Sequence, residues 1–63
     1  MSETEQEIQS LQRQIAQNER ELQSIMRELF KPAADLISLQ KRELELRGQN
    51  IALRRAIIKA RKA

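Results

Sequence analysis

The chain has 63 residues, a net charge of +3 and no Cys, His, Trp or Tyr. These counts exclude a disulfide, a thiolate metal site and a histidine base, and the length suits at most one small domain. One third of the residues are charged, and a single Gly and a single Pro favour long helices over a sheet.

The charges are divided between the two ends of the chain. Residues 1–30 carry six Glu against three Arg, whereas residues 41–63 carry eight Lys or Arg against two Glu. The two ends therefore complement each other within one chain or between two chains. Because the N-terminus is acidic and no apolar run is long enough to span a bilayer, we expect a soluble, cytoplasmic protein.

The pattern predicts a first helix over about residues 3–30. Ser2 with Glu5, or Thr4 with Glu7, fits a capping box at its start. Residues at alternating steps of three and four then form an a/d seam, which comprises Ile8, Leu11, Ile15, Asn18, Leu22, Ile25 and Leu29. Since nearly every residue between them is polar, this helix has one narrow apolar face, which Met26 and Phe30 widen at its end.

Pro32 interrupts the helical pattern because it lacks a backbone N–H and disfavours helical angles at Lys31. The simplest interpretation is two helices separated by a turn over about residues 31–35. A second helix that starts at Pro32 would use proline at its favoured first position and would place Asp35 in the first turn. The alternative is one long helix, kinked at Pro32, in a parallel coiled coil.

The second predicted helix, about residues 36–62, carries two apolar stripes that repeat every seven residues. One stripe is Leu39, Leu46, Leu53 and Ala60, and the other, about 200° away, is Ile37, Leu44, Ile51 and Ile58. A helix that is apolar on two sides needs two neighbours, of which the first helix supplies one. Gly48 either marks the close approach of another backbone or is simply tolerated.

Folding the chain near Ala34 predicts an antiparallel, coiled-coil-like hairpin in which Asn18 meets Asn50, so that each amide satisfies the other. In this register Ile25 faces Glu43, which is an unfavourable pairing. The acidic start lies beside the basic end, with Glu7 near Lys59 and Arg61. The predicted intramolecular seam comprises Ile8, Leu11, Ile15, Asn18, Leu22, Leu29, Leu39, Leu46, Asn50, Leu53 and Ile57.

The sequence contains no catalytic, phosphate-binding or metal-binding pattern, so we expect neither an enzyme nor a cofactor. The uncovered stripe predicts an interface, and its members are Ile37, Leu44, Ile51 and Ile58. It would join two hairpins into a homodimeric four-helix bundle, dock onto a different protein, or do both. The prediction is a single all-α domain that acts as a protein–protein interaction module: an adaptor, inhibitor or assembly factor.

The alternative function is nucleic-acid binding through the basic face of the second helix. The candidate contacts are Arg47, Arg54, Arg55, Lys59, Arg61 and Lys62, and three of the arginines repeat every seven residues, as a line that follows phosphates would. No aromatic residue on this helix offers base stacking, and no helix-turn-helix or zinc-finger pattern is present. Membrane-surface binding is disfavoured because the apolar face lacks large aromatic residues.

Overall fold

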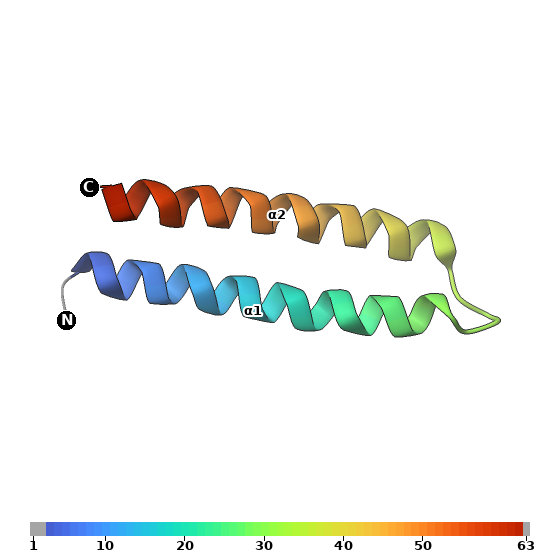
Figure 1. The fold of residues 1–63 in the computed structure, drawn as a ribbon. Helices are drawn as coiled ribbons and strands as arrows, with labels where there is room; N and C mark the ends of the chain where they lie inside the picture. The colour runs from blue at the N-terminus through green and yellow to red at the C-terminus, as the bar shows by residue number, and fades with distance from the viewer. Residues whose placement is uncertain (1–2, 63) are drawn as a thin grey trace.

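The computed structural model describes residues 3–62 as two helices, α1 (Glu3–Leu29) and α2 (Leu36–Lys62), joined by a short turn. The helices lie side by side and antiparallel, so the start of α1 and the end of α2 are at the same end (Figure 1). The molecule measures 48 × 17 × 11 Å, whereas one straight helix of the same length would be about 95 Å long. The predicted hairpin is therefore confirmed, and a single long kinked helix is not the structure.

The turn ends at Asp35, which caps α2. One carboxylate oxygen, Oδ1, accepts a hydrogen bond from the backbone N–H of Ser38 at 3.2 Å, and Oδ2 accepts one from the Ser38 hydroxyl at 2.9 Å. Aspartate is a favoured capping residue because it satisfies an N–H that has no partner within the helix. α2 therefore begins at Leu36, in agreement with the predicted range of about residues 36–62, and the alternative start at Pro32 is wrong. No described residue has a positive φ, so the turn needs no glycine.

The capping box expected at the start of α1 is not described by the structure. Ser2 lies outside the described residues, and Thr4 lies inside α1 because the helix begins at Glu3. Within residues 3–62, neither helix combines the length and apolar character that crossing a membrane requires.

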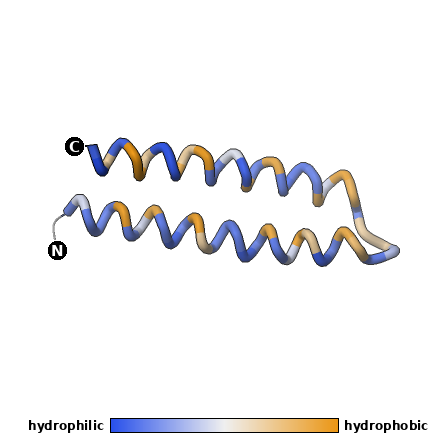
Figure 2. The backbone as a smooth tube through the Cα atoms, in the orientation of Figure 1, coloured by the Kyte–Doolittle hydropathy of each residue, from blue (hydrophilic) through white to orange (hydrophobic). Residues whose placement is uncertain are grey.

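The core is the single interface between the two helices, along which apolar residues recur at regular intervals (Figure 2). The buried apolar residues in the described part of the chain are Ile25, Leu46 and Ile57, and Leu46 is 0% exposed. The other apolar seam residues are partly buried: Ile8, Leu11, Ile15, Leu22, Leu29, Leu39 and Leu53. Three buried apolar residues make a very small core for a chain of this length.

Ile25 belongs to the predicted a/d seam of the first helix but was not included in the predicted intramolecular seam, and it is among the most buried residues, at 5% exposure. The expected obstacle was the charge of Glu43 on the facing helix. The Glu43 side chain is 24% exposed, and its Oε1 lies 3.7 Å from Nε of Arg47, one turn further along α2. Because this carboxylate has an arginine partner and partial access to water, the seam includes Ile25 without burying an unpaired charge.

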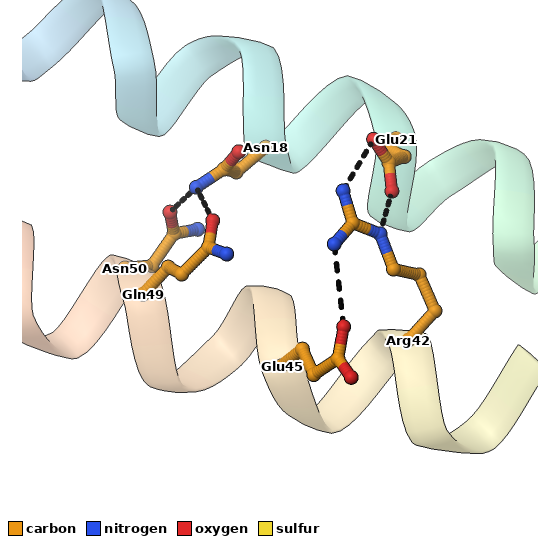
Figure 3. A network of polar contacts seen from close by, with 6 residues as sticks. All are labelled: Asn18, Glu21, Arg42, Glu45, Gln49 and Asn50. Carbon is orange, nitrogen blue, oxygen red and sulfur yellow. Dashed lines mark hydrogen bonds and ion pairs between the residues drawn. The ribbon is translucent and has the colours of Figure 1, made fainter.

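The helices are aligned at their centre by two asparagines. Nδ2 of Asn18 donates to Oδ1 of Asn50 at 2.9 Å and to Oε1 of Gln49 at 3.3 Å (Figure 3). Asn50 is only 5% exposed, so its amide depends on this contact. No buried side-chain nitrogen or oxygen among residues 3–62 lacks a hydrogen-bond partner.

We expect the asparagine pair to behave as one unit in unfolding experiments. Asn18→Leu should lower the free energy of unfolding by about 1–3 kcal/mol, because Asn50 then stays buried without its partner. Asn18→Leu combined with Asn50→Leu should recover most of this loss, since two apolar side chains then fill the seam. Urea unfolding followed by circular dichroism measures both. Gln17→Leu, at an exposed neighbouring position, is the control, and an equal loss in that control would contradict the prediction.

Candidate interaction surface

The second apolar stripe of α2 lies outside the interface between the two helices and is exposed. Ile37 is 82% exposed, Leu44 69%, Ile51 52% and Ile58 53%. Because their spacing is seven residues, the four side chains follow one line along the helix, which we call the α2 stripe. Extended apolar patches of this kind on a small protein mark interaction surfaces.

Two open grooves between the helices border the stripe. Leu22 and Ile51 line one of them, and Ile15, Ile57 and Ile58 line the other. A third groove is lined mainly by polar residues and includes no stripe member; its lining is Gln14, Gln17, Asn18, Gln49, Ala52 and Leu53. The two grooves on the stripe side therefore differ from the third in that exposed stripe members, Ile51 and Ile58, line them.

Met26 adds to the stripe side from α1. It is 49% exposed and lies seven residues after Glu19, so both follow the same line of α1. Oε1 of Glu19 lies 3.1 Å from Nη2 of Arg54, which adjoins the stripe on α2. The sequence predicted no interface role for Met26, although its position directly after the seam residue Ile25 was the available signal.

The borders of the stripe are cationic. On a helix, the neighbours of a residue lie three and four positions away, and for the α2 stripe these are Gln40, Lys41, Arg47, Gly48, Arg54, Arg55, Arg61 and Lys62. Six of these eight residues are cationic and none is acidic. The stripe is thus apolar along its centre and positively charged on both sides.

Two of the border cations are paired within the hairpin. Arg47 is 3.7 Å from Glu43, and Arg54 is 3.1 Å from Glu19. Within residues 3–62, no carboxylate lies at ion-pair distance from the remaining border cations, which are Lys41, Arg55, Arg61 and Lys62. The candidate nucleic-acid contacts are therefore not equivalent, because Arg47 and Arg54 are partly neutralised.

The expected neighbours of Glu7 were Lys59 and Arg61, but no ion pair joins Glu7 to either in the described structure. The helix alignment explains this difference. Arg42 meets Glu21, and stepping fourteen residues outward along each helix from that pair places Glu7 opposite Ala56. The expectation about Glu7 relied only on the two ends of the chain being close together. An ion pair also requires that the two side chains face each other across the helix interface.

Arg42 forms a second polar cluster between the helices (Figure 3). Its Nε and Nη2 donate to the two carboxylate oxygens of Glu21 at 2.5 and 3.2 Å, and its Nη1 donates to Glu45 at 3.3 Å. The hydrogen bond from Arg42 lowers the pKa of Glu21, and the same contact raises the pKa of Arg42. Since Arg42 is two residues before Leu44, this cluster lies about 200° around α2 from the stripe.

Asp35 has the other perturbed carboxylate. The backbone N–H of Ser38, followed by the Ser38 hydroxyl, lowers the pKa of Asp35 by hydrogen bonding to the ionised form. No group of three or more acidic side chains within residues 3–62 is placed to hold a metal ion. The polar clusters therefore serve helix capping and alignment.

Comparisons with protein families, curated proteins and solved structures found no match for this chain. The stripe, its grooves and its cationic borders are therefore the basis for assigning a function.

Gly48 interrupts the border of the stripe at its middle, four residues after Leu44 and three before Ile51. A Cβ placed on Gly48 would meet nothing within 4 Å, so no part of the hairpin requires a glycine there. Glycine in a helix interior costs about 1 kcal/mol relative to alanine. The hairpin itself gives no packing reason for this cost, and Gly48 leaves a bare backbone beside the stripe.

Gly48→Ala should raise the free energy of unfolding by about 1 kcal/mol, because it removes the conformational cost of glycine without creating a clash. Chemical denaturation of the isolated protein measures the change. Ala52→Gly, at an exposed position one turn away, is the matched reverse substitution and should lower the stability by a similar amount. A loss of stability in Gly48→Ala would contradict the open surroundings of this residue.

The lowered pKa values of Glu21 and Asp35 predict a pH dependence of stability. A carboxylate with a depressed folded-state pKa stabilises the fold above its unfolded pKa, and this contribution is lost as the pH falls through the folded value. The wild-type melting temperature should therefore fall on acidification. Glu21→Gln combined with Asp35→Asn should flatten this dependence, whereas Glu3→Gln combined with Glu7→Gln should not. If the melting temperatures of the two double variants depended on pH in the same way, Glu21 and Asp35 would not be the source of this pH dependence.

Proposed function

We propose that the protein is a small, non-enzymatic interaction module that binds another polypeptide through the α2 stripe, as an adaptor, inhibitor or assembly factor. The observation that carries this proposal is the exposure of four aligned apolar side chains, at 52–82%, on a hairpin whose described part buries three. Burying one such side chain contributes about 1.5–3 kcal/mol before ordering costs. A partner on the stripe would therefore add substantially to the small apolar core that the hairpin has by itself.

The stripe also has the form that helix recognition uses. Helix-in-groove complexes depend on apolar residues that recur on one face of a helix, and the grooves beside Ile51 and Ile58 widen that face. The remaining outer surface of α1 is mostly Gln, Glu, Arg and Ser. These features support a single recognition surface on one side of the hairpin.

A pull-down with the immobilised protein, with and without nuclease, tests this proposal. We expect a bound protein that survives nuclease and is lost with Ile51→Glu, because a charge then interrupts the stripe. Ala52→Glu is the matched control, since it places the same charge on the adjacent exposed residue outside the stripe. The triple variant Arg47→Ala, Arg54→Ala and Arg61→Ala should retain the bound protein.

Nucleic-acid binding is the second candidate function, and one observation favours it. Arg55, Lys59, Arg61 and Lys62 are exposed near the end of α2, and no described carboxylate lies at ion-pair distance from them. Under this alternative, nuclease or high salt removes the captured material. The triple arginine variant should then capture less material than the wild type, whereas Ile51→Glu should capture as much. That pattern would overturn the interaction-module proposal.

A further inference from the structure

We propose that the occupant of the α2 stripe is an amphipathic helix of a different chain, with acidic residues on both sides of its own apolar line. This inference rests on the proposed function, because it names the partner class of the same surface. It follows from three features of the hairpin: the straight single-file stripe, the bare backbone at Gly48 and the cationic borders.

The shape of the stripe matches a helix. The stripe runs from Ile37 to Ile58, which are 21 positions apart along α2, a distance of about 31 Å. It is one side chain wide and has polar residues on both sides. A helix laid along this line presents its own seven-residue repeat to the same spacing. Gly48 lies beside the middle of the line with open space around it, which allows the backbone of the partner to come close.

The borders disfavour a second copy as the occupant. Neither border contains an acidic residue, so a second α2 placed on the stripe in either direction brings cations against cations. The second copy's α1 offers no alternative, because its apolar residues pack in its own seam and only Met26 and Phe30 are left largely exposed. Repulsion between the cationic borders would therefore oppose the homodimer that was expected from the sequence.

The same borders favour acidic side chains on the partner. Lys41 and Arg55 lie on one border, on either side of Gly48, and no described carboxylate neutralises them. A nucleic acid would pair with these cations but would leave the apolar line in water. A bilayer surface needs a broader apolar face than one line of side chains. An acidic amphipathic helix covers the apolar line and pairs with both borders.

Two synthetic helical peptides test the proposal. Both carry leucine at every seventh position along one line, and they differ only in the residues beside that line, which are all Glu in one peptide and all Lys in the other. Fluorescence anisotropy with the full chain should show at least tenfold tighter binding of the Glu peptide. This preference should shrink as salt is added, because the charge pairs are exposed.

Charge reversal on the protein provides the matching variant. Lys41→Glu combined with Arg55→Glu should strongly reduce the preference for the Glu peptide, because two of the six border cations then become acidic. The control is Arg13→Glu combined with Arg20→Glu, which changes the net charge equally on exposed positions of α1 and should leave the preference unchanged. Circular dichroism verifies that both variants keep their helix content. Equal binding of the two peptides, or an unchanged preference in the Lys41 and Arg55 variant, would overturn the inference.

Sedimentation of the free chain separates this inference from the proposed function. We expect a monomer of 7.4 kDa. A dimer that Ile51→Glu dissociates would overturn the inference in favour of a second copy, while leaving the stripe as a protein-binding surface. Stripe-dependent binding to a short duplex DNA or to phosphatidylserine vesicles, in place of the Glu peptide, would also overturn it. If Ile51→Glu alters no binding or association at all, the proposed function itself fails.

Discussion

The structure depends on a mismatch in apolar surface between its two helices. α1 has one apolar face, whereas α2 has two that lie about 200° apart, and a hairpin can bury only one of them. Leu46 and Ile57 lie on the buried side of α2, and Ile51 and Ile58 lie on the exposed side. The exposed stripe is therefore a direct consequence of joining a one-sided helix to a two-sided helix, and no rearrangement of this chain alone removes it.

The polar contacts determine which alignment of the two helices is stable, and thereby which surface remains exposed. Asn18 meets Asn50 at the centre, so a slip of one heptad would place Asn18 opposite Ile57 or Glu43 and leave a buried amide without its partner. The pairs Glu21–Arg42 and Glu19–Arg54 lie on opposite sides of the same interface. Exposed ion pairs stabilise weakly, but their positions agree with the register that the amides require.

The heptad repeat was enough to predict the helical lines and the division of α2 into two faces, because both depend on residue spacing, and Pro32 with the facing asparagines favoured the hairpin over one long helix. α2 begins at Leu36, in agreement with the predicted range of about residues 36–62, whereas the start at Pro32 that the rule about proline suggested is not observed, because Asp35 caps the helix. Ile25 was placed on the a/d line of α1, and its pairing with Glu43 was predicted to be unfavourable; the structure buries Ile25, and the Glu43 carboxylate lies near Arg47. The ion pairs between the helices, Glu21–Arg42 and Glu19–Arg54, were not predicted, because the net charge of each half does not reveal which residues face each other across the interface.

The two borders of the stripe differ in a way that bears on how a partner helix would be oriented. On the border of Arg47 and Arg54, both arginines already have glutamate partners within the hairpin. On the border of Lys41 and Arg55, no described carboxylate is at ion-pair distance, and Gly48 leaves the backbone open. An acidic side chain on the second border gains a cation without displacing an existing pair, so of the two acidic sides of the partner helix the one on this border should bind more strongly. The same border allows the closer approach of a backbone, so charge and shape favour one rotation of the bound helix about its own axis.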